Sequence, residues 1–405
     1  MKRSKFNTYL LALAGITLTI SMILFPESAF EAAQDGLAIW WNVVFPALLP
    51  FFIGSELLMG LGVVNFMGSL LEPLMRPLFN VPGEGSFVLA MGLASGYPIG
   101  AILTAKLRRK NIINKTEAER LISMANTADP LFMFGAVAVG FFHDVKLGAL
   151  IALTHYCSAL AVGFTMRFYK PKAPKTQRKA NTNKFFLTRA VQSLTKARAK
   201  DGRPIGELLG DAVKGSVNSL LMIGGFMIFF SVIIKIATVS GMLNPIKHVL
   251  STMLATFGIS TNLSQATASG IFEISLGTKL CSTAIAPITQ QLIITGVIVA
   301  WSGFSVHAQV AAIIHDTDIN IKPYIIARIW QAFLAGIFTW FLLLRNPIME
   351  TGAGFFKLPA NFSVGNTLIF GVKVWSIMCF ALLVIGFITQ LFRIPISYIL
   401  KKKLD

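Results

Sequence analysis

The chain contains the stretch Gly85-Ser-Phe-Val-Leu-Ala-Met-Gly-Leu-Ala-Ser-Gly-Tyr-Pro-Ile-Gly100, which is apolar enough for a membrane but is interrupted in its middle. Proline removes a backbone donor, and glycine weakens a helix interior. Bare backbone groups are tolerated at membrane depth only where they face protein or a polar cavity, and transporters often build their solute and ion sites from such broken segments. A second interrupted segment lies near residues 264–279. One interruption in each half of the chain predicts a transport protein.

The composition predicts a protein that crosses the lipid bilayer several times. Of the 405 residues, 54% are hydrophobic and 13% are charged, and the mean hydropathy is +0.68. Several windows exceed the roughly 20 apolar residues that span a bilayer. The lysines and arginines behind the formal net charge of +18 gather between these windows, as the positive-inside rule requires. We therefore expect the lipid bilayer, and no nucleic acid, as a partner.

The expected fold is an all-α, polytopic membrane protein with about eight transmembrane helices. Two further apolar regions, 61–105 and 245–285, do not fit as simple crossings, and we interpret each as an amphipathic piece followed by a re-entrant helical hairpin. This topology leaves both termini in the cytoplasm together with most of the basic residues, whereas a crossing at 85–105 would place a basic cluster outside. The expected spans are 8–25, 37–59, 121–142, 147–168, 213–239, 290–314, 323–344 and 367–391.

The chain divides into two similar halves around a basic linker. Each half has a long span, a helical piece, a broken hairpin and two more spans, and Ala94-Ser-Gly96 recurs as Ala268-Ser-Gly270. The first span of the first half runs from the outside to the inside of the membrane, and the first span of the second half runs the other way. This predicts an inverted repeat with a shared site near the midplane. The expected units are an N-terminal transmembrane helix and outer loop (1–36), a first repeat with a hairpin near 85–105 (37–168), a basic cytoplasmic linker (169–212), a second repeat with a hairpin near 260–285 (213–345), and an outer loop, last transmembrane helix and basic C-terminal tail (346–405).

The linker is polar, basic and rich in proline. Its part 185–199 suits an amphipathic helix on an anionic membrane surface. A disordered connector whose basic residues keep it on the cytoplasmic side suits the composition equally well, so both interpretations stay open.

The first broken segment supplies candidate substrate-binding residues. Gly96, Tyr97 and Pro98 occupy the tip of the first hairpin, where backbone amides and helix ends could hold a solute or its anionic group. The same residues would also suit a simple tight bend. Asn126 and Asp129 lie early in an expected span. An ionisable residue inside a span is costly and is by default a functional hypothesis, and the alternative is that Asp129 caps a helix at the cytoplasmic interface.

The second half contributes a matching polar set. Glu273 lies at the second broken segment, where it suits coupling to a proton or sodium ion or binding of a polar solute group; a structural pair with Lys279 is the alternative. A lone histidine in an apolar span, such as His307, is often only a hydrogen-bonded polar residue. The candidate substrate-binding residues of this half are Ser269, Gly270, Glu273, Ser275, His307 and Gln309.

The sequence lacks the motifs of common enzymes. It has no HExxH, no GxSxG and no GxxxxGK phosphate loop, so we expect no enzyme activity, no ATP-driven pump and no cofactor. The run His315-Asp-Thr-Asp318 has metal-ligand residue types, but it falls at a span end without a second ligand cluster. We interpret it as a solvated loop and expect no metal site.

Four strings of the sequence carry a resemblance to a known family: Ile39-Trp-Trp-Asn-Val-Val-Phe-Pro-Ala-Leu-Leu-Pro-Phe-Phe52, Leu71-Glu-Pro-Leu-Met-Arg-Pro-Leu-Phe79, Gly92-Leu-Ala-Ser-Gly-Tyr-Pro98 and Gly135-Ala-Val-Ala-Val-Gly-Phe-Phe142. They resemble the YlbJ-type sporulation integral membrane proteins of endospore-forming Firmicutes. That family carries the gate or nucleoside-recognition domain and is similar to concentrative nucleoside transporters, in which two opposed re-entrant hairpins and two broken helices form the substrate site. The resemblance covers most of the chain and implies that the segments at Gly96–Pro98 and Gly270–Ser275 are those hairpins.

The resemblance also implies a setting and a substrate. The family is associated with spore cortex formation, and its members are thought to move dipicolinic acid across the outer forespore membrane, which derives from the mother cell. This implies a multi-pass protein of a bacterial cell membrane with a small-molecule solute as partner. A second copy of the chain and other sporulation membrane proteins are the candidate protein partners.

The leading hypothesis is a transporter or facilitator of a small polar, anionic metabolite that works by alternating access. One alternative is a nucleoside or cation-coupled secondary transporter. Another is a membrane scaffold for spore-envelope, or cortex, assembly with no transport of its own. A membrane-embedded enzyme has the least support, for want of a motif.

Overall fold

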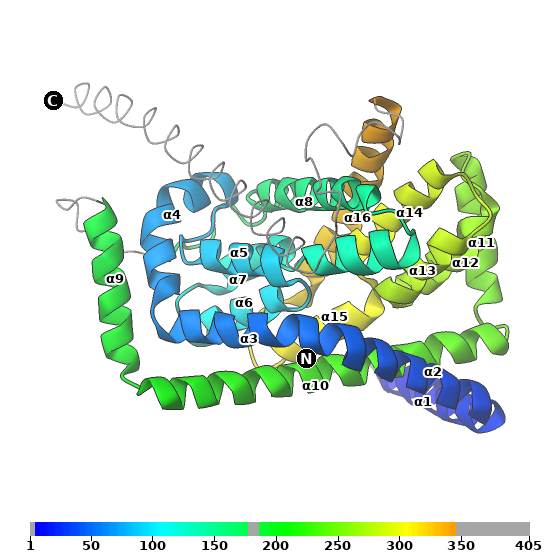
Figure 1. The fold of residues 1–405 in the computed structure, drawn as a ribbon, viewed down its shortest axis with the longest axis horizontal. Coiled ribbons are helices and arrows are strands. Elements are labelled where there is room, and N and C mark those ends of the chain that lie inside the picture. Colours follow the sequence, from blue (N-terminus) through cyan, green and yellow to red (C-terminus); the bar gives the residue numbers. More distant parts are fainter. Residues whose placement is uncertain (1–4, 177–185, 346–405) are drawn as a thin grey trace.

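Helices are the only regular elements among residues 5–176 and 186–345, which are the residues that this computed structural model describes. Two parts of the chain repeat one order of elements: a long helix, a helix across its end, a hairpin, a broken helix and a further helix (Figure 1). The first part comprises α3 (Phe45–Gly60), α4 (Val63–Phe79), the hairpin α5 (Gly85–Ser95) and α6 (Ile99–Arg109), the broken helix α7 (Lys115–Ala125) and η2 (Leu131–Phe141), and α8 (Lys146–Met166). The second comprises α10 (Ile205–Val239), α11 (Asn244–Thr256), the turn η3 (Thr261–Leu263), the hairpin α12 (Ser264–Phe272) and α13 (Ile274–Thr283), the broken helix α14 (Ile288–Trp301) and α15 (Gly303–Ile314), and α16 (Ile321–Arg345).

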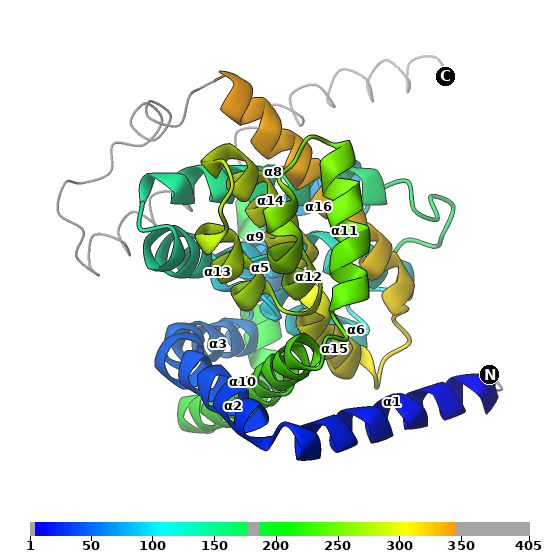
Figure 2. The same cartoon turned by 90° about the vertical axis from the view of Figure 1, so that its right-hand side faces the viewer.

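The chain begins with two helices that meet at 103°, α1 (Lys5–Leu24) and α2 (Pro26–Ile39). Figure 2 shows α1 running away from the other helices. The expected outer loop at 26–36 is wrong, because α2 occupies it. Proline suits the first turn of a helix, and the small residues Ala29 and Ala32 are buried with Val232 and Ile236 of α10.

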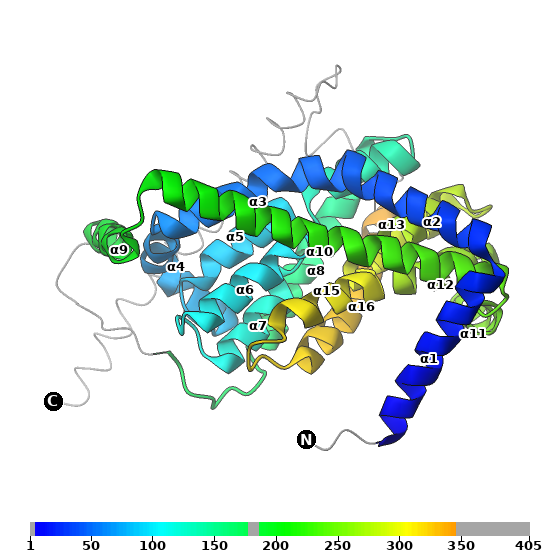
Figure 3. The same cartoon turned by 90° about the horizontal axis from the view of Figure 1, so that it is seen from below.

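A continuous helical path runs from α2 through η1 (Trp40–Val44) into α3. It lies beside α10 in the opposite direction along most of its length (Figures 1 and 3). The Trp40 indole N–H donates to the carbonyl oxygen of Leu220 at 3.0 Å, and a Cβ at Gly224 would be 2.5 Å from the Trp40 ring. The first long helix is therefore fixed to the second along its side.

The two hairpins lie toward opposite ends of the molecule. In Figure 1, α5 and α6 lie near α4 at one end, and α12 and α13 lie near α11 at the other. Each hairpin arm has 9 to 11 residues, which is about 14–17 Å of helix and only half of a hydrocarbon core of about 30 Å. This arrangement suits the predicted inverted repeat with re-entrant hairpins, whose position in a membrane stays a prediction.

Four helical segments of the described residues are long and apolar enough to cross a membrane, or six if the bent pairs α1–α2 and α3–α4 each count as one. Two expected spans are not simple rods. The span 121–142 is split at 126–130, and the span 290–314 is interrupted at Ser302. The expected last span 367–391, within the unit 346–405, lies outside the described residues, so eight crossings stay a prediction.

Part of the linker is helical. The helix α9 (Phe186–Asp201) packs against α4, so the disordered-connector interpretation is wrong for these residues. The next helix, α10, begins at Ile205, inside the stretch expected to belong to the linker. Whether α9 also touches a membrane surface stays a prediction.

Candidate functional site

The first hairpin packs directly on the end of α7. Gly92 and Gly100, one on each arm, lie against the backbone of Ala125, and a Cβ at either glycine would overlap the Ala125 carbonyl oxygen. Thr127 donates its hydroxyl to the carbonyl oxygen of Gly92 at 3.0 Å. Since only glycine lets two backbones approach this closely, the hairpin is held at the point where α7 ends.

Asp129 lies beside the tip of this hairpin. The chain leaves the helical conformation after Ala125 and resumes it in η2. The Asp129 Oδ1 accepts the backbone N–H of Phe132 at 2.8 Å, so it satisfies one of the donors that a helix start leaves free. At the tip, Gly96 has a φ of +74°, and a Cβ there would be 2.5 Å from the Asp129 Oδ2. Asp129 thus caps a helix against the hairpin tip, whereas its expected position at a cytoplasmic interface stays a prediction.

Glu273 separates the two arms of the second hairpin. Its backbone is extended, with φ −145° and ψ 129°, so α12 ends and α13 begins there. Its Oε2 accepts the backbone N–H of Leu276 at 2.7 Å, which caps α13. The side chain is 5% exposed. The alternative pair with Lys279 is wrong, because Lys279 is exposed and the ion pairs of the described residues do not include it.

The second hairpin meets the second broken helix in the same way. Ser302 and Gly303, between α14 and α15, have φ values of +70° and +79°. A Cβ at Gly303 would be 2.8 Å from the carbonyl oxygen of Phe272, and the Trp301 indole N–H donates to the carbonyl oxygen of Ile271 at 3.0 Å. Each hairpin tip therefore lies against the break in the helix that follows it.

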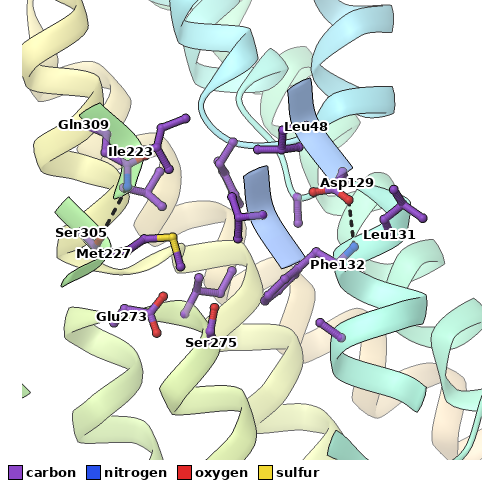
Figure 4. Close-up of a pocket in the computed structure, with 16 residues that line it drawn as sticks. Leu48, Asp129, Leu131, Phe132, Ile223, Met227, Glu273, Ser275, Ser305 and Gln309 are labelled. Carbon is purple, nitrogen blue, oxygen red and sulfur yellow. Dashed lines mark hydrogen bonds between the residues drawn. The ribbon is translucent and has the colours of Figure 1, made fainter. Parts of the chain in front are cut away.

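A cavity of about 120 Å³ lies between these elements. Figure 4 shows Glu273, Ser275 and Met227 of α10 on one side of it and Asp129 and Phe132 on the other. The cavity therefore brings together both broken helices, both hairpins and both long helices. Its lining residues are Val44, Leu48, Tyr97, Ala128, Asp129, Leu131, Phe132, Ala136, Ile223, Met227, Glu273, Ile274, Ser275, Ser305, Val306 and Gln309.

The cavity has mostly apolar walls that include two acidic residues. Asp129 and Glu273 are its charged residue types, and its lining contains no lysine or arginine. Ser275, Ser305 and Gln309 add neutral polar groups, and the Gln309 amide donates weakly to the Ser305 Oγ at 3.4 Å. A few placed polar groups within apolar walls are typical of a small-molecule site.

Five of the predicted site residues line this cavity, and they come from both halves of the chain. The five are Tyr97, Asp129, Glu273, Ser275 and Gln309. The other six are not lining residues. Gly96, Pro98 and Gly270 shape the hairpins, while Asn126, Ser269 and His307 are buried.

The three buried polar residues have specific contacts. The Asn126 amide donates to the Tyr324 hydroxyl at 2.9 Å, and Ser269 accepts from the Gln265 amide at 3.5 Å. The His307 Nδ1 lies 2.7 Å from the carbonyl oxygen of Gly303, as expected for a hydrogen-bonded histidine in an apolar helix.

The sequence interpretation missed the buried residues Arg328, Tyr324 and His155, which surround the first hairpin tip. Arg328 and Tyr324 are both 0% exposed, and the His155 Nε2 accepts the backbone N–H of Ala128 at 3.0 Å. A signal was available, since Arg328 is an ionisable residue inside an apolar span. Among the described residues, no three His, Cys, Asp or Glu side chains are grouped as a metal site would need.

Comparison with known proteins finds one matching family model and a weak likeness to solved structures. A family model described as "Gate: Nucleoside recognition" matches residues 41–169, which include α3 to α8. The solved structures of CNTnw in an inward-facing substrate-bound state and of a CNTnw variant in an outward-facing state resemble the chain weakly. They have TM-scores of 0.39 and 0.36 and identities of 13% and 12%; each covers 79% of this chain, and the alignments cover 84% and 85% of theirs.

The sequence relatives identify the family. The chain is 50% identical over 349 residues to the sporulation integral membrane protein YlbJ of Bacillus subtilis, across 86% of this chain and 85% of that protein. It is 28% identical over 182 residues to an uncharacterized protein of Alkalihalophilus pseudofirmus, across 43% of this chain and 37% of that protein. The chain belongs to the YlbJ family of sporulation integral membrane proteins, and the resemblance seen in its sequence is confirmed.

Proposed function

We propose that this chain is a membrane transporter that moves a small polar solute through the cavity between its hairpin tips by alternating access. One observation carries the proposal: Asp129, in the break of the first broken helix, and Glu273, at the tip of the second hairpin, each cap the start of a half-helix and line one cavity. Broken helices around a shared central site are the construction that secondary transporters use. A scaffold would not require two carboxylates to converge on a cavity.

The charge of the cavity limits the solute. Two ionised carboxylates in surroundings of low polarity would repel an anion strongly, and the lining contains no basic side chain to offset them. We therefore propose that the solute enters neutral, or that an anion enters together with protons carried by Asp129 and Glu273. A dicarboxylic acid such as dipicolinic acid, the substrate implied by resemblance, would move by the second route.

A nucleoside is the second candidate. The description "Nucleoside recognition" of the family model that matches residues 41–169 favours it. A nucleoside is neutral and carries hydroxyl donors, which suit the acceptor oxygens of Asp129, Glu273 and Ser275. The two candidates differ in charge, so their flux should respond differently to pH: dipicolinate uptake should rise with an inward proton gradient, and nucleoside uptake should respond less.

Flux through purified protein in liposomes tests the proposal. We expect wild-type protein to transport dipicolinate or a nucleoside above the background of empty liposomes. The isosteric changes Asp129→Asn and Glu273→Gln should each lower that flux more than tenfold. Asp211→Asn is the control, because Asp211 lies on α10 with a side chain 54% exposed and pairs with Arg203 away from the cavity.

Three results would contradict parts of this proposal. If wild-type protein transports neither dipicolinate nor a nucleoside, the chain is not a transporter of these solutes, and the scaffold alternative is favoured. If flux continues at the wild-type level in both cavity variants, the site assignment is wrong. If dipicolinate uptake is indifferent to a proton gradient, the carboxylates do not carry its protons.

A further inference from the structure

The Arg328 guanidinium on α16 is buried without a carboxylate partner in the described part of the chain. Its Nη1 donates to the carbonyl oxygen of Asn126 at 2.9 Å, and its Nη2 donates to the carbonyl oxygen of Ser123. The same Nη1 lies 3.5 Å from the hydroxyl of Tyr97 at the first hairpin tip. One side chain of the second half thus bridges the broken helix and the hairpin of the first half.

The break in α7 explains why a cation is stable there. The last carbonyl groups of a helix lack intrahelical partners, and they form the negative end of the helix dipole. α7 ends at Ala125, and Ser123 and Asn126 are buried, so these carbonyl groups lie away from bulk solvent. A guanidinium, with five donors on a planar frame, can bind two carbonyl oxygens at once.

The same carbonyl groups would otherwise suit an inorganic cation. In transporters with discontinuous helices, unwound backbone carbonyls and the C-terminal ends of half-helices coordinate the coupling ion. We propose that the Arg328 guanidinium takes the position of a coupling cation at the carbonyl oxygens of Ser123 and Asn126. Transport by this protein then needs no sodium or potassium ion at these carbonyl groups. The proposal rests on the transport function proposed above, but the occupancy of the carbonyl site can be tested without transport.

Arg328→Met tests the site, since methionine fills volume and removes the charge. Purified Arg328→Met should have a lower Tm than wild type in choline chloride. Low-millimolar sodium or guanidinium chloride should restore part of the difference by filling the vacated place. The Tm of the wild type should not respond to either salt at that concentration.

Flux gives the second measurement. Wild-type uptake in liposomes should be equal in sodium, potassium and choline chloride, whereas Arg328→Met should show uptake that rises several-fold on adding sodium or guanidinium. The control is Arg120→Met, because Arg120 is also buried and also donates to backbone carbonyl oxygens, those of Asn80 and Tyr169, away from the cavity. Its Tm should fall, but its flux should remain independent of sodium.

Wild-type flux that requires sodium or potassium would overturn the proposal, as would a Tm of Arg328→Met that no cation restores. If Arg328→Met cannot be purified, Arg328→Lys keeps a positive charge: flux of this variant that remains independent of sodium supports the proposal, and sodium-dependent flux overturns it. If the wild type transports no solute at all, the proposed function fails while the Tm measurement still decides whether the carbonyl site takes a cation.

Discussion

Arg108 and Asp318 form a two-point ion pair, with Nε to Oδ1 at 2.8 Å and Nη2 to Oδ2 at 3.0 Å. Arg108 lies at the end of the first hairpin, and Asp318 lies in the loop between α15 and α16, so the pair joins the two halves of the chain. Arg109 adds a contact to the Asp316 Oδ1 at 2.6 Å. The acidic run that has metal-ligand residue types in the sequence therefore binds arginines.

The first prediction concerns this junction. Asp318→Asn should lower stability only slightly, by roughly 0.5 kcal/mol, because half-exposed ion pairs contribute little; the Asp318 side chain is 47% exposed. The Tm of purified protein measures the effect, and Asp211→Asn, at an exposed ion pair elsewhere, is the control. A fall of more than 5 °C in Asp318→Asn alone would show that the junction contributes far more than its exposure suggests.

The second prediction is a pH dependence at the same place. Hydrogen bonds from Arg109 and Arg108 lower the pKa values of Asp316 and Asp318 below their usual value. A carboxyl group with a lower pKa in the folded state stabilises the fold above its unfolded pKa, near 4, and loses this contribution as the pH falls through the folded pKa. The stability difference between wild type and an Asp316→Asn, Asp318→Asn double variant should therefore be present at pH 7 and shrink below about pH 4. A difference of equal size at pH 3 and pH 7 would contradict the assignment.

The third prediction concerns the packing of the first hairpin on α7. Gly92→Ala should destabilise the protein by about 1–3 kcal/mol, because the added Cβ would overlap the Ala125 carbonyl oxygen and force the backbones apart. Gly225→Ala on α10 is the matched control, since no atom lies within 4 Å of its added Cβ and alanine favours a helix. The Tm values of the two variants should move in opposite directions or differ clearly. Equal Tm values would mean that the hairpin does not press on the end of α7.

The fourth prediction separates the two roles of Glu273. Glu273→Ala removes the acceptor for the Leu276 N–H and should cost about 1 kcal/mol in stability, as the loss of a helix cap does. Glu273→Gln keeps an oxygen that can accept this hydrogen bond, so its Tm should stay near that of the wild type while proton-linked flux is lost. A Tm of Glu273→Gln as low as that of Glu273→Ala would show that the charge, and not the hydrogen bond, stabilises the hairpin.

Local chemistry made several elements predictable. The two hairpins and the helical pieces α4 and α11 lie where the sequence places them. At the first hairpin the reason is local, because Gly96 has a φ of +74°, which glycine adopts without steric cost. Glycine and proline do not interrupt every helix, since Pro73 and Pro77 lie inside α4. The helix α2 was not predictable in the same way. Residues 26–36 carry three acidic side chains, a pattern that predicts an outer loop. The helix is favoured by the burial of Ala29 and Ala32 against α10.

The sequence by itself determined that this chain is helical, that it belongs in a membrane, and in which regions its two hairpins lie, because these properties follow from composition and from the backbone preferences of individual residues. Only the tertiary structure decided which polar groups meet. Asp129 and Glu273 share one cavity, and Arg328 binds the carbonyl oxygens of Ser123 and Asn126 some two hundred positions earlier. Such contacts depend on how the two halves pack together, and no local pattern in the chain records that packing.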